Sequence, residues 1–338
     1  MFIRVSGTGF HNSIMKLVPP SGRTLINFKV TGKVLNIQLI GNIITENSVD
    51  IDERDNSADL DITVSVTPAI LLINKDEMVD INILPDVLSI RQQNYSFEAT
   101  REWESRFELP QWDDSIAEPF DEKEFVDIVR SVRYLDAIAN VTKQPLSNIT
   151  FYNKSAYCLY SNVLLRRNTS IGDFTLTSET ARNLQRLLDV QCKYVVNKEK
   201  GYIFIKTKYK FIYALTQPVD VQTVAAMDKK LSECKHLTDV SLSGMSEDID
   251  TLVRVYKNGK VVFNITDSSL SLLITDGKNT FTYGSRQLPK ASMKFTISHL
   301  NSINKMFYGS GGIKASTGGN VLCLNLNSLT LLISGTLF

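Results

Sequence analysis

The sequence predicts an α+β protein built from three copies of one fold. A strand-then-helix segment begins at Asp61 and recurs from Asp173 and from Lys294. Each copy alternates apolar and polar residues, passes through Ser or Thr, and ends in a short amphipathic stretch, which is the pattern of a half-buried strand followed by a helix. The copies are separated by domain-length intervals, not by the about 20–50 residues of a solenoid repeat.

The residues after each segment predict antiparallel hairpins. Runs of β-forming residues, broken by turn residues, fill 80–99, 193–215 and 312–333. Short runs of this kind between turns are typical of hairpin strands. Each half-unit is therefore expected to have the order β-α-β-β-β.

A second half-unit is expected before each segment. In the first copy, strands are predicted at 25–30 and 34–40, but the helix has only 12–18 before Pro19-Pro20. The helical part of the repeated segment, 69–74, is also scarcely more than one turn. The first copy is thus expected to have degraded helices.

The other two copies have clearer patterns. In the second, 121–139 forms an amphipathic helix with acidic residues in its first turn, followed by strands at 149–152 and 156–160. In the third, 221–235 is predicted as the helix, with Val224, Leu231 and Cys234 inward. A hairpin is expected over 252–265 around Asn258-Gly259. Polar linkers place the domains at 1–114, 115–218 and 219–338.

Composition is that of an ordinary folded chain. With 338 residues, 43% hydrophobic, there is apolar mass for two or three cores. A net charge of +1 means that any nucleic-acid contact needs charge segregated on one face. The four cysteines form no CxxC pair, so reduced, mostly buried thiols are expected and no metal site. No leader pattern and no membrane-length apolar run are present, which favours a cytoplasmic protein without membrane contact.

Catalytic signatures do not emerge. The three histidines, His11, His236 and His299, fall at unrelated points of the repeat. The glycine-rich stretch 309–312 lacks the Lys-Ser/Thr that follows in a phosphate-binding loop. An acidic stretch at 50–55 is expected to be a loop. The sequence predicts no cofactor and a protein that is not an enzyme.

Three consecutive domains, each a pair of βαβββ halves, resemble the bacterial sliding clamp, the ring-shaped processivity subunit of replicative DNA polymerase. Residues 107–110 look like the family's domain-one exit, 294–298 like the start of its last helix, and 331–338 like its apolar tail. The family's loop in domain two is replaced by 160–167, and the first helix is stunted. These departures indicate a divergent clamp, such as a phage-encoded one.

The resemblance implies a homodimeric ring with antiparallel sheets outside and short helices lining the hole. It implies double-stranded DNA, a DNA polymerase and a clamp loader as partners in DNA replication. Phosphate contacts from cations on the inner helices would suffice, because the ring itself retains the duplex. The expected DNA-binding residues are Lys123, Arg130, Arg133, Arg182, Arg186, Lys229, Lys230, Lys235 and Lys305, with His299 beside the last. The same residues also suit ordinary solvated helix faces.

The resemblance also implies a groove between domains two and three that takes short apolar peptides from partners. By position, the groove residues are expected to be Leu146, Val163, Leu164, Leu165, Pro218, Leu332, Ile333 and Phe338. Leu146 and Ile333 also fit plain core positions.

Two other functions stay open. A monomeric clamp-like processivity factor would bind linear and circular DNA alike, with strong salt sensitivity. A β-rich structural protein of a virus particle would bind neither DNA nor polymerase.

Overall fold

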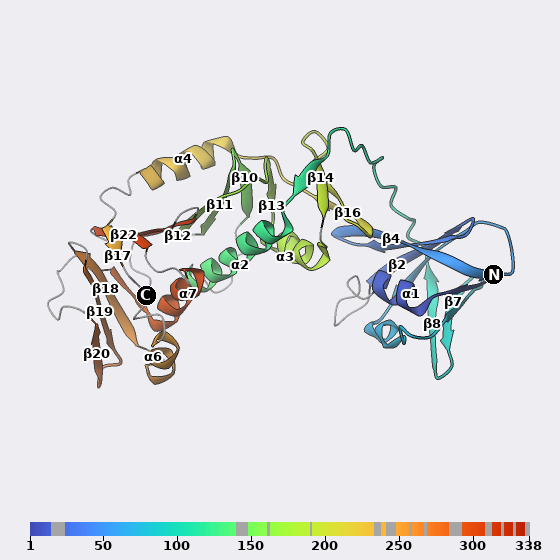
Figure 1. Cartoon of the computed structure of the whole chain (residues 1–338), viewed down its shortest axis with the longest axis horizontal. Helices are drawn as coiled ribbons and strands as arrows, with labels where there is room; N and C mark the ends of the chain where they lie inside the picture. The colour runs from blue at the N-terminus through green and yellow to red at the C-terminus, as the bar shows by residue number, and fades with distance from the viewer. Residues whose placement is uncertain are drawn as a thin grey trace. The chain divides into compact units, whose positions relative to one another are not determined.

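The computed structural model describes residues 1–14, 24–139, 148–160, 163–189, 191–232, 238–240, 248–256, 259–266, 269–283, 293–307, 313–318, 321–326 and 329–334. The chain divides into two compact units (Figure 1). The first contains Met1–Glu122 and Arg182–Thr216, and the second contains Lys123–Ala181 and Gln217–Phe338.

The first unit is organised around one twelve-stranded sheet, with strand order β1-β6-β7-β8-β5-β2-β3-β4-β16-β15-β14-β9 and an additional β1–β4 pairing. Its strands are β1 (Phe2–Val5), β2 (Thr24–Thr31), β3 (Val34–Ile40), β4 (Ile43–Arg54), β5 (Leu60–Val66), β6 (Val79–Ile83), β7 (Val87–Gln92), β8 (Tyr95–Glu102), β9 (Glu118–Phe120), β14 (Cys192–Asn197), β15 (Tyr202–Lys206) and β16 (Lys210–Leu215). Its helical elements are α1 (Gly7–Ile14) and the 3-10 turn η1 (Pro68–Leu72).

Strand alternation forms the core of this unit. Ile26, Phe28 and Val30 on β2 are fully buried, and Phe28 stacks on Phe10 of α1 with ring centroids 6.3 Å apart. Period-two apolar residues on one strand therefore meet the apolar side of a short helix. The helices of the first copy are short, as predicted, although α1 lies at Gly7–Ile14 and the expected segment at 12–18 extends beyond the described residues.

The second unit contains an eight-stranded sheet of order β13-β10-β11-β12-β24-β23-β22-β17 and a four-stranded sheet of order β20-β19-β18-β21. The strands are β10 (Ile149–Tyr152), β11 (Ser155–Tyr160), β12 (Val163–Asn168), β13 (Phe174–Leu176), β17 (Thr238–Val240), β18 (Lys260–Thr266), β19 (Ser269–Thr275), β20 (Thr280–Tyr283), β21 (Met293–Thr296), β22 (Ile313–Gly318), β23 (Val321–Leu326) and β24 (Leu329–Ser334). The helices are α2 (Glu122–Ala139), α4 (Val221–Ser232), α6 (Ile249–Val255) and α7 (Ile297–Phe307), while α3 (Ser178–Leu187) runs from this unit into the first.

Helix α2 buries the apolar stripe that its sequence predicts. Phe125, Ile128, Val129 and Val132 are all at most 2% exposed. The Phe125 ring stacks on Phe151 of β10, with centroids 6.0 Å apart. The i, i+3, i+4, i+7 spacing therefore fixes which side of α2 faces the sheet.

The three repeated segments are strand–helix units, as predicted. They form β5 with η1, β13 with α3, and β21 with α7. At the second of these, the Thr177 side-chain oxygen accepts the backbone N–H of Thr180 at 3.1 Å, which is an N-cap contact.

Three expectations about local structure were wrong. Residues 249–255 form helix α6, not a strand of a hairpin. Residues 163–168, read as a loop, form the central strand β12. Much of the acidic stretch 50–55 belongs to strand β4.

Strand pairing also changes the role of α4. In each copy the first strand pairs with the strand that follows the second helix, giving β1–β6, β9–β14 and β17–β22. By this rule α6, which follows β17, is the first helix of the third copy. Helix α4, predicted for that role, precedes β17 and has no counterpart in the repeat.

Candidate interaction surfaces

The cations of α2 lie on its solvent face. Lys123, Arg130 and Arg133 are exposed, and the spacing of seven residues between Lys123 and Arg130 places them on one side. Acids share the surface, because Arg130 contacts Asp127 at 3.3 Å. This face mixes charges but presents three guanidinium or ammonium groups to solvent.

Helices α3 and α7 contribute further cations. Arg186 is exposed and Arg182 is half-buried on α3, and Lys305 is exposed on α7. His299 differs from the expectation, because only 1% of it is exposed and burial lowers the pKa of its imidazole. It is therefore a core histidine. Lys235 lies outside the described residues.

Lys229 and Lys230 are exposed but lie on α4, on the other face of the sheet from α2. Adjacent residues of β12 show this directly, because successive side chains of a strand point to opposite faces. Arg167 contacts Asp127 of α2 at 3.4 Å, whereas Arg166 contacts Asp228 of α4 at 3.7 Å. Figure 1 shows the two helices on opposite sides of β11 and β12. The predicted set of DNA-binding residues is thus divided between two surfaces.

Helix α4 covers an apolar surface on the eight-stranded sheet, called here the α4 face. A buried cluster joins Val224 and Met227 of α4 to Tyr157, Leu164 and Leu332 of the sheet. Half-buried side chains border this cluster: Tyr152, Leu159, Val219 and Leu231. The register pairs Leu159 with Leu164 and Leu164 with Leu332, so these three leucines form one row across β11, β12 and β24.

A polar contact lies beside this cluster. The Tyr157 hydroxyl donates to the Asp228 carboxylate at 3.0 Å, and the Arg166 guanidinium lies 5.8 Å from the centre of the Tyr157 ring. Burial, and then the hydrogen bond to Asp228, raise the pKa of Tyr157 above its ordinary value, while the charge of Arg166 opposes the shift. At neutral pH the phenol is therefore the donor and the carboxylate the acceptor.

The predicted groove residues occupy different faces of this sheet. Leu164 and Leu332 contact the α4 cluster, but Val163, Leu165 and Ile333 are at alternate positions, at most 2% exposed, and belong to the opposite face. Pro218 lies three residues before the first residue of α4. Leu146 and Phe338 lie outside the described residues.

Sequence reasoning missed Tyr157 and Met227. Met227 could have been predicted from the sequence, because Val224, Met227 and Leu231 follow the i, i+3, i+7 spacing of an apolar helix face.

Two sheet junctions join successive copies. The last strand of a first half-unit pairs with the last strand of the next copy's second half-unit: β4 with β16, and β12 with β24. Both junctions are antiparallel. Continuous backbone hydrogen bonding therefore runs from one copy to the next.

The fold matches solved structures along its whole length. A DNA polymerase III beta subunit from Eubacterium rectale matches with a TM-score of 0.74 at 12% identity, covering 100% of both chains. The DNA polymerase sliding clamp of Bacillus subtilis matches at 0.69 and 14% identity, over 99% of this chain and 98% of that one. The Helicobacter pylori beta clamp, solved bound to a DNA ligase peptide, matches at 0.67 and 11% identity over 99% of each chain.

The chain has the fold of a bacterial sliding clamp. No family model and no curated protein matches its sequence. The likeness to clamps that the sequence suggested is therefore established by the structural matches.

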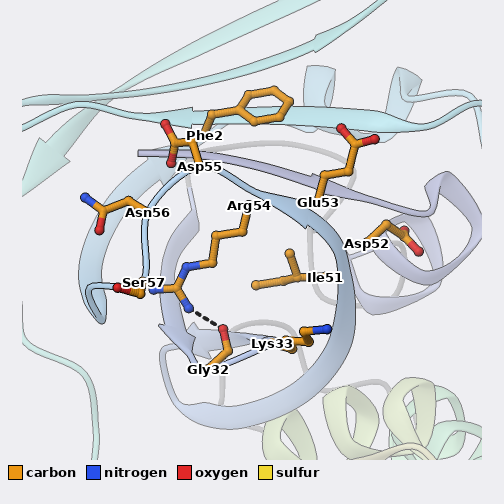
Figure 2. Close-up of a pocket in the computed structure, with 10 residues that line it drawn as sticks. All are labelled: Phe2, Gly32, Lys33, Ile51, Asp52, Glu53, Arg54, Asp55, Asn56 and Ser57. Carbon is orange, nitrogen blue, oxygen red and sulfur yellow. Dashed lines mark hydrogen bonds between the residues drawn. The ribbon is translucent and has the colours of Figure 1, made fainter.

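A cavity of about 1020 Å³ opens beside strand β4 of the clamp fold (Figure 2). Acidic side chains Asp52, Glu53 and Asp55 line it, but the Arg54 guanidinium donates to the backbone carbonyls of Gly32 and Ala58. These hydrogen bonds connect Arg54 to the turn at Gly32 and to the segment at Ala58, so Arg54 has a structural role.

Within the described residues, the structure brings together no cluster of three or more His, Cys, Asp or Glu side chains that could ligate a metal ion. None of the described helices has the length and hydropathy of a membrane span. The side chains of Cys158, Cys192 and Cys323 are buried, as expected.

Proposed function

We propose that this chain is a sliding clamp: a head-to-tail homodimeric ring of three domains per chain that encircles duplex DNA and tethers a replicative DNA polymerase. The observation that carries the proposal is the strand–helix repeat joined by two equivalent sheet junctions, in a fold that matches beta clamps over the whole chain. The domains are taken as 1–114, 115–218 and 219–338, and a clamp loader would open the ring. Such a role needs geometry and charge, not catalysis.

The junction rule supports closure by a second copy. Applied once more, it would pair β20, the last strand of the third copy's first half-unit, with β8, the last strand of the first copy's second half-unit. Within the described residues, β20 pairs with β19 alone, and β8 pairs with β5 only at Arg101 and Glu102. Exposed strand edges invite pairing with another chain, and a head-to-tail contact that closes gives a ring.

An exposed aromatic residue supports the same contact. Trp103 directly follows β8 and is 94% exposed. Tryptophan is enriched at the energetic centres of interfaces. Burial of Trp103 against the third domain of the partner subunit would account for its exposure in the single chain.

The DNA surface is assigned to α2, α3 and α7. These helices carry Lys123, Arg130, Arg133, Arg182, Arg186 and Lys305. Lys229 and Lys230 are left out, because α4 lies on the opposite face of the sheet from α2. A few mobile phosphate contacts suffice when the ring retains the duplex.

Partner proteins are proposed to dock on the α4 face, through short segments with apolar anchors. The Helicobacter pylori beta clamp was solved with a DNA ligase peptide, which supports peptide docking on this fold. Leu164 and Leu332 are the predicted groove residues that lie at this face. Pro218 lies in the segment that leads into α4. Polymerase and loader are the proposed sources of such segments.

The test is retention on DNA after loading. The loaded protein should stay on nicked circular duplex through gel filtration and should leave the same DNA once it is linearised. Equal retention on both forms, with steep salt dependence, would instead support a monomeric factor held by charge. No association with either form would refute the clamp.

A matched pair of variants tests the DNA surface. Lys123→Glu with Arg133→Glu should weaken loading and flatten its salt slope, since α2 loses two phosphate contacts. Lys229→Glu with Lys230→Glu makes the same charge change on α4 and should load normally. The reverse result would place the DNA on the α4 side.

A further inference from the structure

Helix α4 is an addition to the repeat. The first strand of the second copy, β9, is preceded by 103–117, a segment without helix or strand, whereas β17 of the third copy is preceded by α4. The sheet junction between β12 and β24 is made by strand pairing and does not involve α4. The fold can thus be built without this helix, and its position calls for another explanation.

The contact that holds α4 is small. Val224 and Met227 are its buried residues, and Leu231 is half-buried. Ala225 and Ala226 are exposed, and Val221 is 51% exposed. The polar link between Asp228 and Arg166 lies near solvent, with side-chain exposures of 46% and 39%, so it contributes little. Segments with few buried contacts are those that open locally at low free energy.

The surface beneath α4 is suited to an apolar ligand. With α4 displaced, Tyr157, Leu164 and Leu332 would be uncovered together with Tyr152 and Leu159. A contiguous apolar patch bordered by Arg166 is characteristic of a docking site. Its bound segment is visible: α4 presents apolar residues at i, i+3 and i+7 and a carboxylate at i+4, which accepts from Tyr157 and pairs with Arg166.

We propose that α4 is an intramolecular competitor that occupies the partner-docking face and must be displaced before a partner binds. The partner is an amphipathic segment with the α4 spacing of apolar residues and one acidic side chain. This inference rests on the proposed docking of partners at this face. It adds that α4 covers the face in the free chain. The apparent affinity for a partner is then the intrinsic affinity multiplied by the fraction of time that α4 is undocked.

The probe is a fluorescein-labelled peptide with the sequence of residues 217–232 of this chain, titrated with the full-length protein by fluorescence anisotropy. The release variant carries Val224→Asp and Met227→Asp, which expel α4 from the cluster. It should bind the peptide at least about tenfold more tightly than wild type, because no tethered competitor is present at high effective concentration. The matched control, Lys229→Asp with Lys230→Asp, alters the exposed side of the same helix and should behave as wild type.

Further variants make each outcome decisive. Leu164→Glu in the release variant should abolish binding, and a peptide carrying Met227→Asp should not bind. Circular dichroism checks folding, and a milder release pair, Val224→Ser with Met227→Ser, replaces the first if that one fails to fold. Equal binding by wild type and a folded release variant, or binding by neither, would overturn the proposal. The proposal would also be overturned if the release variant had a higher molecular mass in solution and Leu164→Glu reversed that increase. This result would mean that a second copy of the chain binds the α4 face.

The peptide titration needs no DNA. If the protein is not retained on circular DNA but the titration is positive, the sliding-clamp function is refuted and the competitor role of α4 is supported. If the protein is retained normally but the titration is negative, the clamp function is supported and the competitor role is refuted.

Discussion

Trp103 gives the sharpest test of ring closure. Its 94% exposure in the single chain means that a change to Ser should leave folding stability nearly unchanged. A tryptophan buries roughly 150–250 Å², which at about 25 cal/mol per Å² sets an upper bound of about 6 kcal/mol. Measured truncations at interface centres are commonly about 2–4 kcal/mol.

A head-to-tail ring has two equivalent interfaces, and each would contain one Trp103. At about 2 kcal/mol per site, Trp103→Ser should weaken the dimer by about 4 kcal/mol, or about a thousandfold in Kd. Sedimentation over a dilution series would measure this as a shift from twice 38.0 kDa to 38.0 kDa. The matched control is Tyr209→Ser, at the β15–β16 turn, where the side chain is 61% exposed.

Fluorescence provides an independent reading of the same contact. The chain has two tryptophans, and Trp112 packs on Phe204 with centroids 5.5 Å apart. In a Trp112→Phe background, emission reports Trp103 alone and should shift to the red as the dimer dissociates. A wild-type chain that is monomeric at micromolar concentration, or a Trp103→Ser dimer of unchanged Kd, would refute the interface.

Two further predictions concern the first unit. Asp189→Asn should destabilise the fold by about 3–5 kcal/mol in urea unfolding, because it removes the ion-pair partner, at 3.2 Å, of a Lys210 side chain that is only 5% exposed. The control Asp114→Asn, at an exposed pair with Lys193, should cost at most about 1 kcal/mol. Equal losses in the two variants would contradict the burial argument. Burial raises the pKa of the Cys192 thiol to about 11, so iodoacetamide at pH 8 should modify Cys192 only after unfolding, as measured by peptide mass mapping. Because the folded pKa is raised, the contribution of Cys192 to stability is present below the unfolded pKa and disappears as the pH rises toward 11. Rapid labelling of Cys192 in the native protein would contradict this prediction.

Much of the fold follows from local sequence pattern. The strand–helix units at β5, β13 and β21 were predictable, because alternation and a following Ser or Thr act within a few residues. Helix α2 was predictable from its stripe from Phe125 to Val132. Each of these signals lies inside a single element.

The errors arose where β-propensity and helix period compete. Residues 252–256 are rich in β-formers, yet Ile249, Leu252 and Tyr256 are all buried at a spacing of about one helical turn. Asp250 in the first turn and Arg254 in the last turn also favour a helix. The burial of these side chains, together with the α6–α7 contact, outweighed the local preference for a strand.

The candidate site was less predictable, because it depends on which face each residue of one strand occupies. Leu164 and Leu165 are adjacent and equally apolar, and only the pairing of β12 with β24 decides that Leu164 faces α4. A shift of one residue would exchange them. That register is set by long-range pairing, which no short sequence window contains.

The same dependence on backbone pairing explains how the clamp fold persists at 11–15% identity. The junctions β4–β16 and β12–β24 are held by main-chain hydrogen bonds, which require alternating burial but no particular side chain. The side chains on the exposed faces of these sheets can then diverge as long as the side chains on the buried faces stay apolar. The α4 face is such a surface: Leu164 and Leu332 stay paired across the junction, while the side chains that cover them come from a helix outside the repeat. Divergence in this chain is therefore expected to have altered the α4 face more than the clamp fold.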